Sequence, residues 1–323
     1  MKITTKMSAI AGALALGLGT VSGANATISA QAFLDLENFV IRNATTGNII
    51  NAGVEAGTGV DVVITSIENT TNLSASLDGV DAVGSPFVGS AINTDSPPLC
   101  IGDGCAGIAL VDNAFALLTN PPTGNYVAGD QVDLGSPVTG TQSDGTALPT
   151  TPAQVGVGAW AGLATGDGSG SAEGNNTLGT TFQFVAQTDA ALSFEFDIRS
   201  YLSVFASADE QAGGLANATT SFSFQITDLS DDSIVLFSQP TILNAPLQQI
   251  LPPNVSGLDR ELNWQYTSGT VSSLCFGLTN ANCSAGSTYA GAVLTLGPLV
   301  SGRSYQLDAF ESVAINIERA EIP

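Results

Sequence analysis

Two close pairs of cysteines are the residues of this chain whose type and spacing most readily suggest chemistry. Cys100 and Cys105 enclose four residues in the sequence CIGDGC, and Cys275 and Cys283 enclose seven. Paired thiols form disulfides, redox centres or parts of zinc sites. Zinc knuckles usually place roughly two to four residues between their ligands. Of the connectivities that four cysteines allow, the spacing therefore favours two local disulfides, Cys100 with Cys105 and Cys275 with Cys283.

The first of these pairs has the composition of a tight loop. Gly102 and Gly104 suit a small ring because glycine tolerates positive φ angles, and Asp103 between them is typical of a turn. We therefore interpret the CIGDGC sequence as a loop held closed by a disulfide.

Carboxylates are the other candidate chemical groups, because the chain contains no histidine and its only lysines are Lys2 and Lys6. Serine and cysteine catalysis lose their usual base, and Schiff-base chemistry loses its amine. Glu195 and Asp197 lie on one face of a predicted strand, which is the geometry of some glycosidase acid pairs. Arg199 continues that face, and this favours a solvated, ion-paired surface instead. We therefore expect a protein that is not an enzyme.

Two further sets of residues are candidates for ligand binding. Asp167 and Glu173 lie in the stretch GDGSGSAEGNN, where hard oxygen ligands in a glycine-rich loop suit calcium, the one cofactor considered. A flexible linker is the alternative interpretation of that stretch. Trp264 and Tyr266 share a strand face in LNWQYTSG. Such aromatic side chains stack on sugar rings when they are exposed and join the core when they are buried.

Strands are the elements that the sequence predicts to position these groups. Apolar and polar residues alternate over residues 193–199 and 222–226, which is typical of half-buried antiparallel strands. Residues 228–232 supply turn chemistry before a second apolar run at 234–237, so this segment is predicted to be a hairpin. The other predicted strands are residues 60–64 and 181–185, and one long strand or two short ones within 305–317. Residues 33–41 fit a helix or a strand, and the strand is favoured because no helix-like length follows.

Stretches rich in glycine, proline and asparagine separate these runs. TNPPTGNYVAGD (residues 119–130) and TGDGSGSAEGNN (residues 165–176) are predicted to be loops. The second is the predicted subdomain boundary within a single domain that covers residues 27–323. The fold that we expect is all-β: an antiparallel β-sandwich of jelly-roll type with long Gly/Ser/Asn-rich loops, or alternatively a barrel.

The N-terminal segment, residues 1–26, has the three parts of a secretory signal peptide. Lys2 and Lys6 make a basic start, an apolar run follows, and Ala24-Asn25-Ala26 is a cleavage site of the small-x-small type. No later apolar stretch reaches about 18 residues, so we expect no membrane span in the mature chain. The mature protein is expected to be secreted or held at the cell surface.

The charge balance is strongly acidic. After residue 26, five arginines stand against 29 acids, which gives a net charge of 5 − 29 = −24. Such a surface repels phosphate backbones and anionic lipids, so nucleic acid and peripheral membrane binding are not expected. Only 11% of all residues are charged, and the remaining surface must be rich in Ser, Thr, Asn, Gln and Gly.

Several stretches together resemble the exosortase-dependent surface proteins of the PEP-CTERM class: CIGDGC, NYVAGDQ, SFEFDIRSYLSV, TTSFSFQITDLS and SGRSYQLDAFESVAINIERAEIP. In that family a signal peptide, a Gly/Ser/Thr/Asn-rich β domain and a paired-cysteine loop precede a Pro-Glu-Pro tripeptide, an apolar helix and a basic cluster. This sequence carries the first three features, and the sorting tail itself is absent from the printed chain. The resemblance implies sorting by exosortase to the surface or matrix of a Gram-negative bacterium, with simple secretion as the alternative.

A structural or adhesive role is the function that these observations favour. We expect a non-enzymatic component of the bacterial surface or of an exopolysaccharide biofilm matrix. Its expected partners are exopolysaccharide, other surface proteins or further copies of itself. A lectin-like carbohydrate-binding module is the first alternative, and a filament-forming surface subunit that joins through sheet edges is the second.

Overall fold

The computed structural model describes residues 28–54, 60–84, 87–89, 97–108, 123–164, 170–206, 215–238, 246–250, 258–267, 270–276, 290–296 and 299–319. The elements in chain order are β1 (Ile28–Asn43), β2 (Asn51–Ala52), β3 (Val62–Leu77), β4 (Val80–Val83), β5 (Phe87–Gly89), β6 (Leu99–Ile101), the 3-10 helix η1 (Asp103–Gly107), β7 (Tyr126–Leu134), β8 (Thr139–Gly140), β9 (Ala153–Leu163), β10 (Gly170–Ala186), β11 (Leu192–Ala206), β12 (Leu215–Asp228), β13 (Ser233–Ser238), β14 (Pro246–Ile250), β15 (Leu258–Thr267), β16 (Thr270–Phe276), β17 (Ala290–Leu296) and β18 (Ser304–Arg319).

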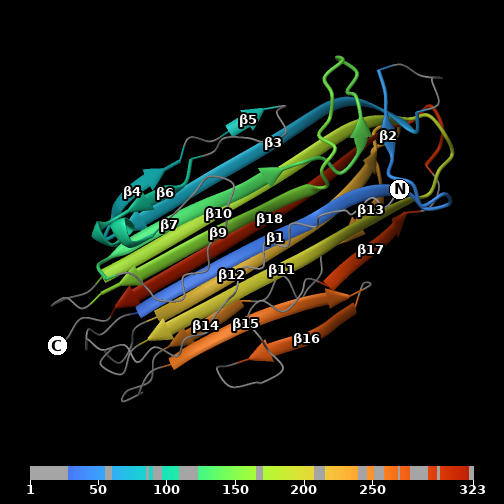
Figure 1. Ribbon diagram of the computed structural model, residues 1–323. Coiled ribbons are helices and arrows are strands. Elements are labelled where there is room, and N and C mark those ends of the chain that lie inside the picture. The colour runs from blue at the N-terminus through green and yellow to red at the C-terminus, as the bar shows by residue number, and fades with distance from the viewer. Residues whose placement is uncertain are drawn as a thin grey trace, which may run out of the picture.

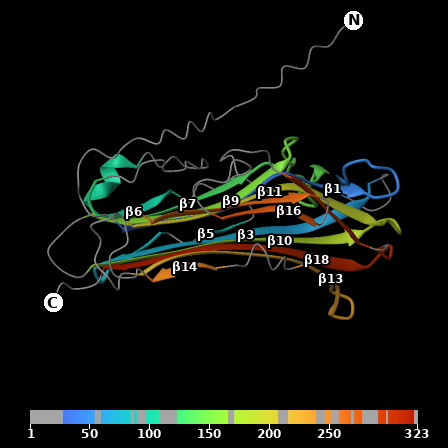
Figure 2. The same cartoon turned by 90° about the horizontal axis from the view of Figure 1, so that it is seen from below.

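Two sheets lie face to face and form a sandwich whose strands run along its long axis (Figures 1 and 2). Sheet A has the order β16-β15-β11-β1-β9-β7-β6, with β17 also paired to β11. Sheet B has the order β13-β12-β18-β10-β3-β2-β8, with β14 paired to β12 and with β4 and β5 paired to β3. The long strands pair antiparallel throughout, so the predicted all-β antiparallel sandwich is confirmed. The strand order does not confirm the finer expectation of a jelly roll.

One apolar core fills the space between the two sheets. Burial alternates residue by residue along β18 and β3, as expected for strands that turn one face to a core. Phe194 of sheet A meets Phe224 of sheet B edge to face, with 4.9 Å between the ring centroids, and Phe39 lies 6.2 Å from the same ring. Aromatic pairs of this geometry contribute about 0.5–1.5 kcal/mol beyond the area that they bury.

Most of the predicted strands are confirmed, and several are longer than predicted. Residues 33–41 lie within β1 and residues 181–185 within the longer β10, whereas β3 begins only at Val62 and so takes in residues 62–64 of the predicted 60–64. The predicted hairpin is formed by β12 and β13. Residues 305–317 belong to one continuous strand, β18, rather than to two short ones.

The two predicted loops are wrong over part of their length. Tyr126 begins β7, and β10 begins at Gly170 and lies at the centre of sheet B between β18 and β3. The turn-forming residues of these stretches serve sheet packing instead. Asn176 reaches across the sandwich and donates a hydrogen bond to the carbonyl of Gly158 at 2.6 Å, and a Cβ on Gly129 would overlap its amide. The proposed subdomain boundary and the single-domain assignment stay predictions.

Helical structure is sparse in the part of the chain that the structure describes. Of these residues, no helix is long and apolar enough to cross a membrane.

Candidate interaction surface

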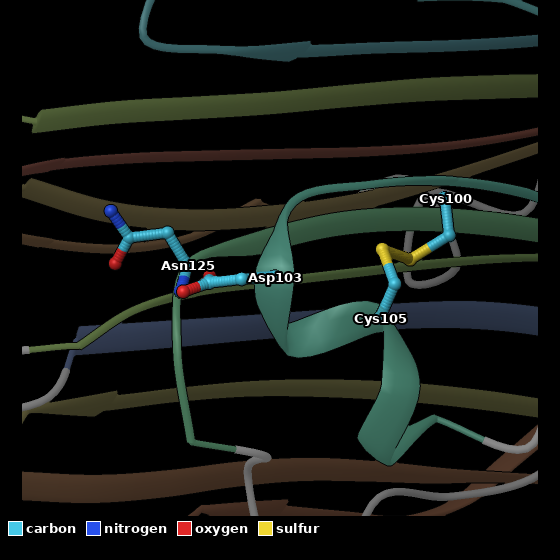
Figure 3. Close-up of a disulfide and its surroundings, with 4 residues drawn as sticks. All are labelled: Cys100, Asp103, Cys105 and Asn125. Atoms are coloured by element: carbon cyan, nitrogen blue, oxygen red, sulfur yellow. A yellow bond between two sulfur atoms is a disulfide. The ribbon is translucent and has the colours of Figure 1, made fainter.

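The CIGDGC loop is held closed by a disulfide between Cys100 and Cys105, as predicted, with the two Cα atoms 5.9 Å apart. The loop lies at an edge of sheet A, where β6 pairs with β7 and η1 follows. Figure 3 shows Asp103 of η1 beside Asn125. The Asp103 carboxylate accepts a hydrogen bond from the backbone N–H of Asn125 at 2.8 Å. Asp103 therefore ties the loop to the residue that precedes β7.

The two glycines of the loop serve different purposes. Gly102 has the predicted positive φ, 108°, which a side chain would strain. Gly104 has no positive φ, so that part of the prediction is wrong. Its role is close packing, because an added Cβ would lie 2.8 Å from the ring of Tyr126. Tyr126 and Trp160 are both 1% exposed, so the loop covers a small apolar cluster on the outer side of sheet A.

The predicted acid pair lies on β11. Glu195 accepts a hydrogen bond from Nε of Arg42 on the neighbouring strand β1 at 2.7 Å, and both side chains are about one-third exposed. An exposed ion pair of this kind contributes little to stability, typically about 0–1 kcal/mol. The side chains of Asp197 and Arg199 lie outside those that the structure describes. Glu195 is therefore engaged with a cation, as a solvated outer face would require.

The predicted aromatic pair and the second cysteine pair are only partly covered by the structure. Trp264 and Tyr266 lie in β15, and Cys275 lies in β16, the strand paired with it. The side chains of these three residues are outside the described part, and so is the whole of Cys283. Their roles in glycan stacking and in a second disulfide stay predictions.

The predicted calcium ligands are divided between a strand and an undescribed segment. Glu173 is exposed on β10, opposite Asn316 of β18 and Ser76 of β3. Asp167 lies outside the described residues. Within the described ranges, no cluster of three or more acidic, histidine or cysteine side chains could hold a metal ion. The calcium site stays a prediction.

The outer side of sheet B is a broad, regular surface. Four long strands, β3, β10, β18 and β12, lie next to one another there (Figure 2). We call the outward-facing side chains of these strands the polar face, and its members are Val63, Thr65, Ser66, Glu68, Thr70, Asn72, Ser74, Ser76, Ser171, Glu173, Asn175, Thr177, Gly179, Thr181, Gln183, Val185, Asn217, Thr219, Ser221, Ser223, Gln225, Thr227, Ser304, Gln306, Asp308, Phe310, Ser312, Ala314, Asn316 and Glu318. Hydroxyl and amide groups therefore dominate this surface.

Hydrogen bonds between neighbouring strands order part of the polar face. Thr181 donates from its hydroxyl to Asp308 at 2.7 Å, and the amide of Gln306 donates to the same carboxylate at 2.9 and 3.1 Å. Gln183 in turn donates to the amide oxygen of Gln306 at 2.9 Å. These side chains form a connected network across β10 and β18, which holds them in place without a ligand.

The polar face carries no cation. None of its members is lysine or arginine. Arg303 at the start of β18 binds Asp228 and also Asp231, the latter at 3.0 Å, and Arg319 at its end is buried and donates to the carbonyl of Leu163 at 3.0 Å. The described cations near this sheet are therefore bound at its ends, and the face itself holds only a few acids among neutral groups.

Phe310 is the one aromatic side chain that is exposed among those described, at 44%. It lies in the middle of the polar face, in register with Gly179 of β10 on one side and Ser223 of β12 on the other. A Cβ added to Gly179 would lie 3.8 Å from the Phe310 ring, so the ring leans over the glycine.

The next residue along β18, Glu311, is an acidic residue at a position where the other strands turn side chains toward the core. It is 1% exposed at an inward position of β18, and neither carboxylate oxygen makes a hydrogen bond among the described residues. Burial raises the pKa of the Glu311 carboxyl well above its ordinary value, and the negative charges of Asp35 and Asp133 raise it further. Glu311 is therefore held in the core as a neutral acid.

Sequence analysis missed the polar face and Phe310. The signal was present, because polar and apolar residues alternate along β18 apart from the outward Ala314, the inward Arg319 and the inversion Phe310-Glu311, where a large apolar residue takes the outward position. Counting positions along the predicted strand would have found it. The length of β10, which brings Gly179 beside Phe310, had no comparable signal.

Removal of the disulfide should weaken the fold modestly. We expect the double variant C100S/C105S to lose about 2 kcal/mol of unfolding free energy, because the unfolded chain regains the entropy of a closed six-residue loop. Urea denaturation of parent and variant measures the difference. An unchanged midpoint and slope would show that Asp103 and the packing of Gly104 hold the loop without the bond.

Glu311→Gln should change how stability depends on pH. Below the ordinary carboxyl pKa of about 4.3 the side chain is neutral in both states. Above it the unfolded chain loses the proton while the folded chain keeps it, so unfolding free energy falls by up to about 1.4 kcal/mol per pH unit until the raised pKa is passed. Glu311→Gln removes this loss, so its advantage over the parent should grow from pH 4.5 to 7 in urea titrations.

The matched control for this change is Glu318→Gln, which alters an exposed acid on the same strand. Its effect on the unfolding free energy should be smaller than that of Glu311→Gln, because an exposed side chain changes its surroundings little on unfolding. If the advantage of Glu311→Gln did not grow with pH, Glu311 would be charged in the folded protein, contrary to the account of its burial.

Comparisons with known proteins gave no relative. No protein-family model matches the chain, and no curated protein and no solved structure matches it. Function must therefore be argued from the surface chemistry of this sandwich.

Proposed function

We propose that this protein is a non-enzymatic structural or adhesive component of a bacterial cell surface or of its exopolysaccharide matrix. The observation that carries the proposal is the polar face, a cation-free array of hydroxyl and amide groups over four strands of 14 to 17 residues. Such a surface can make many weak hydrogen bonds over a large area, which is how an adhesive or matrix protein holds its neighbours.

The small size of the cavities inside the sandwich is a further argument that the protein acts through its surface. Two cavities of about 20 Å³ each lie among the described residues and are lined mainly by core side chains such as Phe182. That volume admits a single water molecule. Sites for small-molecule substrates usually measure about 300–1,000 Å³. These two cavities are thus too small for a substrate, while the outer side of sheet B offers a broad regular face.

Export supports the same role. The disulfide between Cys100 and Cys105 suits an oxidising compartment, and residues 1–26 have the composition of a signal peptide. The resemblance to exosortase-dependent proteins adds a sorting route to the surface of a Gram-negative bacterium. Simple secretion into the matrix would serve the same function.

A filament-forming subunit is the second candidate, and exposed apolar residues at both edges of sheet B favour it. Val80 and Val83 of β4 are 62% and 66% exposed, and Ile234 of β13 is 60% exposed. Exposed strand edges invite pairing with another chain. The net charge of −22 opposes close approach of two copies, which is why we place adhesion first.

A deletion strain tests the proposal. Immunoblots of cell fractions should find the protein at the surface or in the matrix, and deletion should weaken the cohesion of cell aggregates under shear. Re-expression of the parent should restore cohesion. Re-expression of T177K/S312K, which puts two cations on the polar face without touching the core, should restore export but not cohesion.

The matched control is V80K/V83K, which adds the same two charges on the edge strand β4. It should restore cohesion fully. Failure of this control, together with filaments in electron micrographs of the parent alone, would favour the filament-forming subunit. A cytoplasmic location, or unchanged cohesion after deletion, would contradict the proposal.

A further inference from the structure

The position of Phe310 is not explained by the needs of the fold. Its neighbours along the outer side of β18, Asp308 and Ser312, are polar, as they should be on a solvated face. A phenyl ring at this position leaves 44% of the side chain in water, whereas the other described phenylalanines with known exposure are buried. Aromatic residues, phenylalanine among them, are enriched in the buried centres of interfaces.

Gly179 beside it is also not required by the backbone. Its φ is not positive, and an added Cβ would meet only Phe310 at 3.8 Å and the carbonyl of Thr70 at 3.9 Å, both ordinary contacts. A larger residue would fit there and would suit a strand better, because glycine in a strand is destabilising. Glycine at such a position often marks the close approach of a ligand. An aromatic side chain that packs against a strand glycine restores part of the stability that the glycine loses. The surface beside the Phe310 ring nevertheless stays open.

Hydroxyl, amide and carboxylate groups surround this ring on the polar face. Ser223 is in register with Phe310, Asp308 and Ser312 precede and follow it on β18, and the diagonal neighbours are polar as well; these are Thr177, Thr181, Ser221 and Gln225. Neighbouring strands lie about 4.8 Å apart, and successive outward residues about 6.6–7 Å apart. Donors and acceptors therefore lie on every side of the ring except toward Gly179.

The charges near the ring select the chemistry of the ligand. Asp308 is the one acidic side chain among these neighbours, and it already accepts hydrogen bonds from Thr181 and Gln306. The polar face has no lysine or arginine, and the whole chain carries a net charge of −22. An acidic polysaccharide or nucleic acid would be repelled, and a polycation would find only scattered acids. A neutral ligand is not repelled by the acidic protein and does not need a dense array of acids to bind.

The shape of the face narrows the class further. Phe310 has no polar atom, so it can only offer its ring face, and an apolar ring face suits the flat C–H side of a pyranose. The long strands of sheet B lie side by side in one layer (Figure 2). An extended polymer can follow these strands along their length, and β-linked chains, whose hydroxyl groups point sideways, have that shape.

We propose that Phe310 and the open surface over Gly179 form a binding platform for a neutral, β-linked polysaccharide, whose hydroxyl groups bond to the surrounding side chains of the polar face. This inference rests on the proposed adhesive function and names the ligand and the site. It places glycan stacking on β18, whereas the sequence suggested Trp264 and Tyr266 on β15.

The test uses the exported chain and two variants that act by different means. Affinity electrophoresis in gels that contain hydroxyethyl cellulose, with cellohexaose titrations by calorimetry, measures binding of the parent, F310A and G179T. We expect both variants to bind about tenfold more weakly, the loss of about one stacking contact. G179T should be at least as stable as the parent, because threonine favours strands and the site has room for its Cβ.

Two controls make the result specific. F310Y keeps the ring and should bind like the parent, and V83S removes an exposed apolar side chain outside the polar face and should also bind like the parent. Alginate, a polyanion, should not retain the protein. The proposal is overturned if the parent binds no neutral glucan, if G179T and F310A bind as well as the parent, or if V83S weakens binding equally.

These outcomes are separate from those of the proposed function. A protein found at the cell surface, with cohesion that depends on it, and with binding unaffected by G179T and F310A would leave the adhesive role standing without this site. A cytoplasmic protein that nevertheless binds cellohexaose through Phe310 would contradict the function and keep the site.

Discussion

Sheet B carries opposite chemistry on its two sides because successive side chains of a strand point to opposite faces. Four of its strands are 14 to 17 residues long and keep their register apart from one irregularity, between Gln183 and Phe184 where β10 pairs with β3, so each inward apolar residue fixes the outward position of its neighbour. A slip of one residue would turn the core outward. Packing of the apolar core between the sheets therefore sets the arrangement of the polar face. Interactions among the outward side chains are not needed to make that arrangement regular.

The single inversion of this alternation in β18 gives the surface its distinctive group. Phe310 faces solvent and Glu311 faces the core, and each position would be more favourable with the other type of residue. The fold tolerates the inversion because Glu311 can stay protonated and because Phe310 leans over Gly179. Local departures from an otherwise consistent pattern are expected at functional positions. The inversion thus lowers the stability of the fold, and it gives the surface an exposed aromatic side chain.

The sequence predicts the class of fold and several elements well, since period-two patterns such as that around Phe194 and Phe196 reflect burial directly. It also predicts the Cys100–Cys105 disulfide, because a short spacing leaves few alternatives. It fails where tertiary packing overrides local preference. The stretch around Asn176 reads as a loop, yet in the sandwich its asparagine bridges the sheets to Gly158. No local pattern reveals that contact, which depends on strands brought together from distant parts of the chain.

The same limit applies to the candidate site. The aromatic residues that stand out in the sequence are Trp264 and Tyr266, because they are large and close together. Phe310 is a single residue in a strand, and its significance appears only when β10 places Gly179 beside it and β12 places Ser223 on the other side. A site on a flat sheet is assembled from register, so each residue on its own looks ordinary.

In this account, the apolar core of the sandwich holds the polar face of sheet B in a regular arrangement. The most direct test of that description is aromatic NMR of phenylalanine-labelled protein during titration with cellohexaose. Of the 14 phenylalanines, Phe310, identified by the signal missing in F310Y, should shift first and most, while the core rings stay unchanged. A Phe310 signal that does not move at saturating glycan, or shifts confined to the indole of Trp264, would contradict it.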